Sequence, residues 1–278
     1  MKTDPVTRSP WADWREATPA RLALGRAGSG MPTDEVLRFG WAHAMARDAI
    51  HAALDVEALA AALAADGWTV ERARSRVPDR AAYLRRPDLG RQLDPADAAR
   101  LRESAGHPSG PCDLCIVVGD GLSSLAIERH AAPLLAALRQ HLAGELALAP
   151  VTIASQARVA LADDIAECFG ARLSIMLIGE RPGLSSPDSL GIYLTHSPRR
   201  GRHDAERNCI SNVRQPHGLS YALAAFKLGW LVREALRRGI TGVGLKDESD
   251  RAVIAAGGPD ALPRSEPTPS EPTPGDKT

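Results

Sequence analysis

The sequence has few of the features that place a protein in a membrane, outside the cell or on nucleic acid. No apolar stretch in its 278 residues approaches the roughly 20 residues that cross a bilayer. Residues 1–14 lack the apolar core that secretory signals contain. The 34 basic residues are balanced by 34 acidic ones, which argues against binding nucleic acid through bulk positive charge. We therefore predict a cytoplasmic protein.

Cysteine is also scarce. Four cysteines are too few and too scattered for a disulfide framework, so we predict reduced thiols. Cys112 and Cys115 have the spacing of a redox pair or of half a zinc site, but a zinc site needs a second pair of ligands. Cys168 and Cys209 are distant single residues. We therefore predict no metal site and expect Cys115, which lies in an apolar run, to pack in the core.

Nucleotide-binding and catalytic motifs are missing as well. Gly25, Gly28 and Gly30 look at first like a phosphate loop, but neither Gly-x-Gly-x-x-Gly nor Gly-Lys-Ser/Thr is present, and no clear strand precedes them. A flexible turn is the preferred interpretation. No local motif supplies a nucleophile with its base or a pair of catalytic carboxylates. The sequence predicts no complete catalytic site within this chain.

The first third of the chain has a sequence pattern that is typical of helices. Thr33 can cap a helix whose first turn contains acidic residues. Apolar residues after it fall on more than one helical face, which predicts a helix packed on several sides. Further helices are predicted over residues 56–65, 79–84 and 95–102.

From about residue 111, strands alternate with helices. Apolar runs predict strands over 114–118, 150–153 and 173–178, and an alternating pattern predicts a fourth over 189–195. Helices are predicted over 122–142, 162–169 and 219–238, the last capped by Gly239. Fully apolar strands that alternate with helices indicate a parallel sheet covered on both faces. We therefore predict an α/β fold that follows a helical N-terminal region.

The end of the chain has a different composition. Residues 251–278 contain six prolines and two consecutive copies of Ser-Glu-Pro-Thr-Pro. Such a segment cannot bury enough apolar surface to offset the entropy of ordering it. We predict a disordered tail.

Two loops follow predicted parallel strands at the edge where α/β proteins bind ligands. Residues 119–123 either bind a ligand through glycine backbone and a helix N-terminus or form an ordinary turn capped by Asp120. The loop that begins at Glu180 and Arg181 is polar and held by glycine and proline, which favours a functional site. The alternative is a Glu180–Arg181 pair that only holds the turn.

A long polar connection is predicted over residues 197–212. Loops of this length are often functional. Its arginines at 199, 200 and 202 could bind anions or face a partner chain. Cys209 is the one cysteine set in polar sequence, and no adjacent base supports it as a nucleophile.

Several motifs occur together in one order. They are Thr-Pro-Ala-Arg at 18–21, Gly-Arg-Ala-Gly at 25–28, Val-Gly-Asp-Gly-Leu at 118–122, Gly-Glu-Arg-Pro-Gly-Leu at 179–184, Ser-Leu at 189–190, Tyr193, Ser-Pro-Arg at 197–199 and Asn-Cys-Ile-Ser-Asn at 208–212. Through them the sequence resembles the light chain, or small subunit, of ethanolamine ammonia-lyase, over about residues 15–247.

This resemblance implies an enzyme that uses adenosylcobalamin to convert ethanolamine to acetaldehyde and ammonia by radical rearrangement. It also implies a partner, the heavy chain, which is a TIM barrel that holds the substrate, in a larger oligomer of heavy–light pairs. The light chain, Rossmann-like in its C-terminal part, closes over the cobalamin at the subunit interface. The implied cobalamin contacts are Val159, Glu180 and Cys209. The resemblance leaves open whether a bacterial microcompartment encloses the enzyme.

The implied organisation has four parts. They are a flexible N-terminus (1–17), a helical region contacting the heavy chain (18–105), a Rossmann-like cobalamin-contacting domain (106–247) and a disordered Pro-rich tail (248–278). No histidine has Asp two residues before it, so the cobalt-binding motif Asp-x-His-x-x-Gly is absent. This agrees with a cofactor that keeps its own benzimidazole on cobalt. Two alternatives remain, a stand-alone corrinoid- or nucleotide-binding module and a purely structural partner subunit.

Overall fold

A six-stranded sheet forms the centre of the computed structural model, which describes residues 5–105, 112–142, 144 and 146–251. Its strands are β3 (Val70–Arg74), β4 (Leu114–Gly119), β5 (Val151–Ser155), β6 (Leu173–Gly179), β7 (Leu190–His196) and β8 (Arg207–Val213). Their order is β3-β5-β4-β6-β7-β8. The first four strands in this order are parallel, and β7 and β8 continue the sheet antiparallel to their neighbours. The predicted α/β class with a mainly parallel sheet is confirmed.

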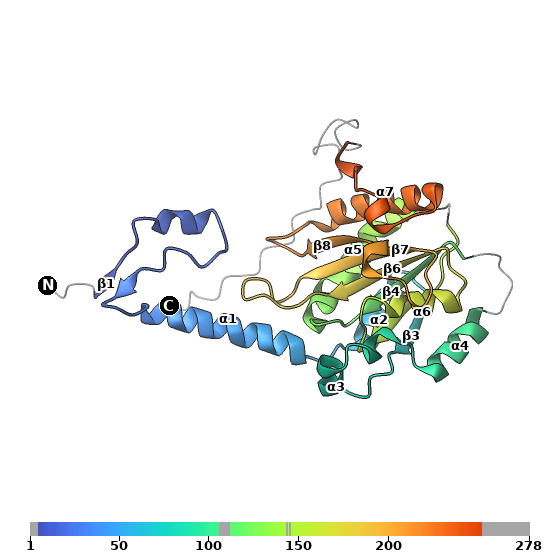
Figure 1. Cartoon of the computed structure of the whole chain (residues 1–278), viewed down its shortest axis with the longest axis horizontal. Coiled ribbons are helices and arrows are strands. Elements are labelled where there is room, and N and C mark those ends of the chain that lie inside the picture. Colours follow the sequence, from blue (N-terminus) through green and yellow to red (C-terminus); the bar gives the residue numbers. More distant parts are fainter. Residues whose placement is uncertain (1–4, 106–111, 143, 145, 252–278) are drawn as a thin grey trace, which may run out of the picture.

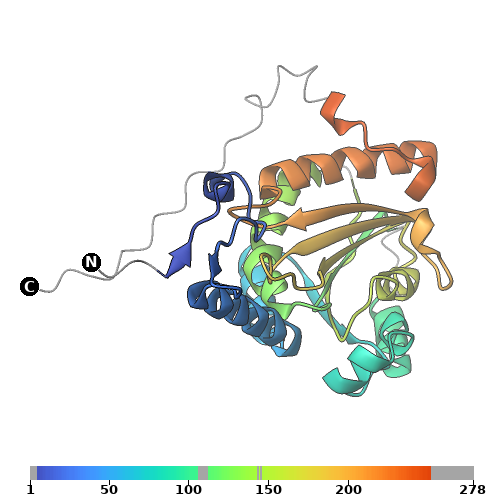
Figure 2. The same cartoon turned by 60° about the vertical axis from the view of Figure 1, so that its left-hand side comes forward.

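Helices cover both faces of this sheet. One face packs against α2 (Val56–Ala65), α5 (Ser124–Leu142) and α7 (Tyr221–Arg238). The other packs against α4 (Pro95–Ala105) and α6 (Leu161–Cys168), and Figure 2 shows α6 and α7 on opposite sides of the strands. Every residue of β4 and β6 is buried, because apolar strands of this kind need cover on both faces.

The N-terminal arm, residues 5–51, projects from this body in Figure 1. It contains β1 (Val6–Thr7), the 3-10 helix η1 (Ala12–Glu16), β2 (Arg26–Ala27) and α1 (Thr33–His51). The predicted cap of α1 is wrong, since Pro32 occupies the N-cap and no side chain caps the helix. Packing of α1 on several sides is not seen within this chain. The only large side chain of α1 that is buried is Glu35, because most of the helix stands away from the sheet.

Two strands of the six-stranded sheet lie where none was predicted, as do the short strands β1 and β2 of the arm. β3 belongs to the stretch that reads as helical, and β8 occupies part of the predicted polar loop. Both are edge strands rich in polar residues, so they lack the apolar signal of β4 and β6. The other elements are α3 (Arg80–Arg85) and the 3-10 helices η2 (Leu89–Arg91), η3 (Asp204–Glu206) and η4 (Gly242–Gly244).

The ends of the last long helix agree with the sequence. Ser220 caps α7 by accepting a hydrogen bond from the Leu223 N–H, and Gly239 ends it in the left-handed conformation (φ 68°). Within the described part of the chain, no helix combines the length and the apolar character needed to span a membrane. The predicted disordered tail lies outside the described residues from position 252 onward.

Candidate functional site

The last two strands present a polar, open face on the α6 side of the sheet. Along β8, Ile210 points into the core beneath α5 and α7, whereas Cys209 points to the opposite side and is exposed. Cys209 pairs with Tyr193 of β7, which in turn pairs with Met176 of β6. Since α6 packs on β4 and β6, the surface beyond it stays accessible. We call the surface formed by Glu180, Gly191, Tyr193, Cys209 and Ser211 the open face.

Hydrogen bonds hold Glu180 at the edge of the open face where the strand β6 ends. It is the first residue after β6, and its carboxylate accepts hydrogen bonds from the Ser189 hydroxyl, the Ser211 hydroxyl (2.5 Å) and the Asn212 N–H (3.3 Å). The carboxylate lies over Gly191, where an added Cβ would come within 2.9 Å of Oε1. A carboxylate offers about four acceptor positions, so Glu180 keeps capacity for one further donor. The predicted alternative of a Glu180–Arg181 pair is not what holds this turn.

Cys209 and Tyr193 contribute neutral groups. Tyr193 and Cys209 are direct cross-strand partners on β7 and β8. Desolvation raises the pKa of Cys209, and the negative charge of Glu180 acts in the same direction. Burial likewise raises the pKa of Tyr193. Both side chains are therefore uncharged near neutral pH, which suits packing against a broad uncharged ligand and argues against a nucleophilic thiolate.

Val159 reaches the same side of the sheet from the loop between β5 and α6. It is half-buried in the cluster that also contains Tyr193. Its loop is fixed by Tyr83, whose hydroxyl donates to the Ala157 carbonyl (2.8 Å) and whose ring lies 4.2 Å from the Arg158 guanidinium. The structure thus places Val159, Glu180 and Cys209 on one side of the sheet, and their role as cofactor contacts stays a prediction.

The protein's own side chains and backbone occupy the space at the loop over residues 119–123. Asp120 is buried and accepts hydrogen bonds from the N–H groups of Gly121, Gln156 and Ala157. An added Cβ on Gly121 would lie 2.3 Å from the Gly179 carbonyl oxygen. The loop therefore packs directly against the end of β6 and fills the crevice between β4 and β6. The strand order reverses at this crevice, which is where doubly wound folds bind nucleotides. The turn interpretation is favoured here, and the nucleotide-binding alternative loses its usual site.

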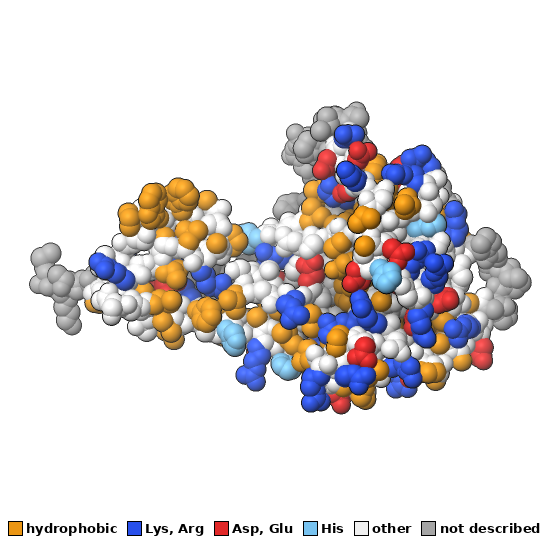
Figure 3. Space-filling view, viewed as in Figure 1, with side chains coloured by type: hydrophobic (Ala, Val, Ile, Leu, Met, Phe, Trp, Pro, Cys, Tyr) orange, Lys and Arg blue, Asp and Glu red, His pale blue; other side chains and the backbone are white. Residues whose placement is uncertain are grey.

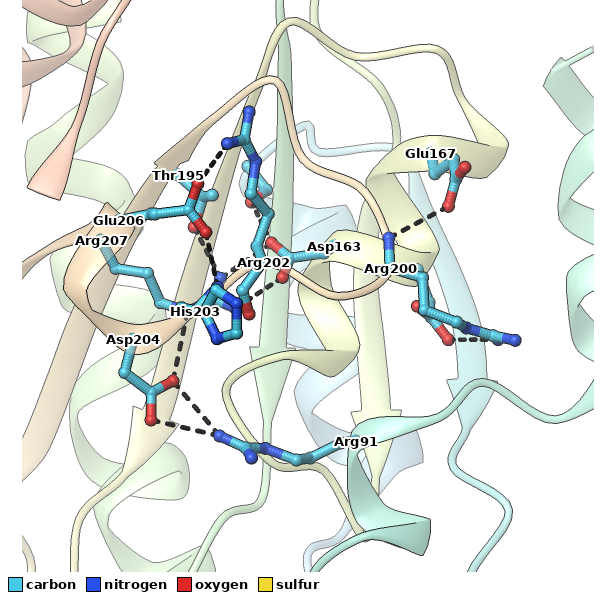
Figure 4. A network of polar contacts seen from close by, with 12 residues as sticks. Arg91, Asp163, Glu167, Thr195, Arg200, Arg202, His203, Asp204, Glu206 and Arg207 are labelled. Carbon is cyan, nitrogen blue, oxygen red and sulfur yellow. Dashed lines mark hydrogen bonds and ion pairs between the residues drawn. The ribbon is translucent and has the colours of Figure 1, made fainter.

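Two of the three predicted anion-binding arginines, Arg200 and Arg202, have acidic partners within the chain, whereas Arg199 is exposed. Arg200 pairs with Asp164 at 2.7 Å, and Arg202 pairs with Glu206. Figure 4 shows the Arg202–Glu206 pair beside another pair, Arg207–Asp163. The four cysteines are free, and no group of potential metal ligands occurs within the described residues.

Some site residues had no role assigned from the sequence. Ser189, Tyr193 and Ser211 lie within the recognised motifs, but only the folded sheet shows that they surround Glu180 and Cys209. Asp163 had no sequence signal at all, because an acidic residue in the first turn of a helix is ordinary.

Together, the fold and the site define an α/β protein whose mainly parallel sheet has an accessible polar face. A family model described as ethanolamine ammonia-lyase light chain (EutC) matches residues 8–246. The chain belongs to this family, which confirms the resemblance seen in the sequence.

Curated relatives named ethanolamine ammonia-lyase small subunit support the same assignment. The relative from Azotobacter vinelandii is 54% identical over 255 residues, which cover 91% of this chain and 94% of the relative. The relative from Bradyrhizobium diazoefficiens is 56% identical over 255 residues, covering 91% and 96%. The relative from Ralstonia nicotianae is 52% identical over 254 residues, covering 91% and 93%.

Proposed function

We propose that this chain is the small subunit of an adenosylcobalamin-dependent ethanolamine ammonia-lyase and that its open face holds the cofactor against a TIM-barrel large subunit. The observation that carries the proposal is the gathering of Val159, Glu180 and Cys209 on one accessible side of the sheet. The reaction converts ethanolamine to acetaldehyde and ammonia. Its substrate-binding residues belong to the large subunit in this proposal.

The residues present fit cobalamin, a broad apolar ring fringed with amides. Val159 and the ring of Tyr193 supply apolar surface, and the thiol of Cys209 is neutral. The carboxylate of Glu180 is held by its three donors with room to accept an amide N–H. When bound, the cofactor supplies the radical chemistry, and the protein supplies position and the exclusion of water.

The N-terminal arm supports a large-subunit interface. Its exposed apolar side chains include Trp11, Trp14, Leu37 and Trp41, which are 61%, 63%, 67% and 71% exposed. Figure 3 shows hydrophobic side chains gathered on this arm. Monomeric proteins rarely expose such surface, and tryptophan often anchors protein interfaces. The arm, including residues before the predicted contact region 18–105, is therefore the proposed docking surface.

The arm is also tied to the open face. The Arg21 guanidinium donates to the Leu184 carbonyl and to the Ser185 hydroxyl, each at 3.1 Å. These two residues belong to the loop that follows Glu180. A large subunit that binds the arm therefore also reaches the cofactor surface. The proposal places the complex, an oligomer of heavy–light pairs, in the cytoplasm, where free thiols persist.

Cofactor affinity of the assembled complex tests this proposal. Replacing Glu180→Ala removes a charged acceptor and is expected to weaken adenosylcobalamin binding by about tenfold to a hundredfold. Glu103→Ala is the matched control, since Glu103 is an exposed carboxylate on α4. Assembly with unchanged affinity in the Glu180 variant would favour the purely structural subunit. Tight cobalamin binding by this chain alone would favour the stand-alone module.

A further inference from the structure

A buried ion pair lies beneath the open face. The guanidinium of Arg207 and the carboxylate of Asp163 are 2% and 1% exposed. The Nη1 group of Arg207 donates a hydrogen bond to Oδ1 of Asp163 (2.9 Å), and Nη2 lies at the ion-pair distance of 2.7 Å from Oδ2, which accepts no hydrogen bond. Arg207 also donates to the Thr195 hydroxyl (2.8 Å) and to the Arg202 carbonyl (3.0 Å). The pair is therefore a rigid, two-point contact, as Figure 4 shows.

The pair joins two of the three segments that carry implied cofactor contacts. Asp163 lies in the first turn of α6, four residues after Val159. Arg207 begins β8, two residues before Cys209, and its side chain therefore points to the same side of the sheet. The hydrogen bond and the second, close N–O contact join the first turn of α6 to the start of β8.

This contact ties the start of β8 to α6, whereas Asn208 ties the strand to the η4 segment. As an edge strand, β8 pairs with β7 alone, and the pairing is irregular near Leu190 and Ile192. The Arg200–Asp164 pair beside it is 66% exposed at the arginine and can add little. A buried pair is expensive in desolvation, and apolar residues of similar volume often stabilise a protein at least as well. Stabilisation of the fold alone therefore does not account for the presence of the Arg207–Asp163 pair.

We propose that Asp163 and Arg207 are positioning residues for the cofactor, and that their two-point contact sets the separation of Val159 from Cys209. This inference rests on the proposed function of the open face. The side chains themselves are buried and do not touch the ligand. They act through the backbone of α6 and β8.

The decisive variant keeps the fold and removes the fixed geometry. Deleting one partner would leave an uncompensated buried charge and threaten folding, so both are replaced together, as Asp163→Leu with Arg207→Met. A second variant, Arg207→Lys, keeps the charge but replaces the planar fork with a single point. Arg200→Lys, in the neighbouring exposed pair, is the control.

The measurements are the dissociation constant of cyanocobalamin with the assembled complex, the urea midpoint of each variant and the split between KM for adenosylcobalamin and kcat. We expect the double variant and Arg207→Lys to assemble and to bind cyanocobalamin about tenfold more weakly. The loss should appear in KM for the cofactor, with the control unchanged. The double variant is expected to keep the urea midpoint of the wild-type complex. If its midpoint falls, the cyanocobalamin affinity of Arg207→Lys tests the positioning role instead.

Two outcomes separate the inference from the function on which it rests. If Glu180→Gln and Cys209→Ser weaken cyanocobalamin binding while both ion-pair variants bind normally, the positioning role is overturned. If none of these variants changes the affinity of an assembled complex, the cofactor-holding function of the open face is itself wrong.

Discussion

Ser211 illustrates at the residue scale how the chain prepares Glu180. Its hydroxyl donates to Oε1, while the Ser189 hydroxyl and the Asn212 N–H donate to Oε2. These donors fix the direction of the carboxylate. An acceptor that is already oriented loses less entropy when a ligand amide binds.

Removing the Ser211 hydroxyl should therefore weaken cofactor binding more than it weakens folding. For Ser211→Ala we expect a loss in adenosylcobalamin affinity of about twofold to tenfold, the value of one hydrogen bond. Equilibrium dialysis of the assembled complex measures this loss. Ser104→Ala is the matched control, because Ser104 donates to the distant carboxylate of Glu71. Equal affinity in both variants would show that Glu180 needs no such support.

His130 makes the stability of the chain depend on pH. His130 is 3% exposed, and its Nδ1 lies 2.8 Å from the Tyr221 hydroxyl. Its Nε2 lies 3.5 Å from the carboxylate of Asp188, which also pairs with Arg129. Burial lowers its pKa from the ordinary 6.5, against the opposing effect of Asp188. The unfolded chain therefore binds a proton at a higher pH than the folded chain does. Stability falls as the pH drops below about 6.5.

The variant His130→Gln removes this proton-linked step. We expect it to be less stable than the wild type at pH 7.5 by about 1–3 kcal/mol, since a buried hydrogen-bonded network is broken. Between pH 7.5 and 5.5 it should lose less stability than the wild type. Urea unfolding at both pH values measures the difference, and other titrating groups cancel in the comparison. Parallel pH dependence of the two proteins would rule out His130 as the source.

At the scale of elements, prediction succeeded where a segment is buried on both sides. The apolar runs at 114–118 and 173–178 correspond to β4 and β6, in which every residue is buried. β3 and β8 were not predicted, because edge strands expose polar side chains such as Arg72 and Ser211.

The same limit applies to the candidate site and to α1. Motifs led to Val159, Glu180 and Cys209, but the hydroxyl groups around Glu180 come from β8 and from just before β7 and meet only in the folded sheet. An apolar helical face looks the same in sequence whether it meets the protein's own core or another chain. The pattern after Thr33 therefore predicted packing on several sides without saying which chain supplies the contacts, and in this chain alone the structure shows exposure.

The end of α7 offers a test of an element that sequence did predict. Gly239 has φ 68°, and an added Cβ would meet only His196 at an ordinary 3.9 Å. Gly239→Ala should therefore destabilise the protein through backbone strain alone, by about 1–2 kcal/mol. Gly239→Asn should lose less, because asparagine tolerates the left-handed region. Thermal unfolding compares the two, and an alanine variant as stable as the asparagine variant would contradict a strained cap.

At the scale of the whole molecule, the arm and the body have separate tasks. The body buries its apolar residues around the sheet, whereas the arm exposes them. Replacing Trp41→Ala together with Leu37→Ala should leave the folding of the body unchanged. It should weaken association with the large subunit by about 2 kcal/mol or more, roughly thirtyfold. Sedimentation of mixed subunits measures the association.

Val243→Ala is the control for this experiment, since Val243 is 84% exposed but lies on the body, in η4. It should associate as the wild type does. If the arm variant also associates normally, the large subunit docks elsewhere on the molecule.

The central claim is that cobalamin covers the open face, and the reactivity of Cys209 tests it most directly. The assembled complex is alkylated with and without saturating adenosylcobalamin, and each cysteine is followed by peptide mass spectrometry. Cys112, which is half-buried away from the open face, serves as an internal control. We predict that the cofactor slows the alkylation of Cys209 at least about tenfold and leaves Cys112 unchanged. Equal alkylation of Cys209 in the saturated and the cofactor-free complex would contradict the account.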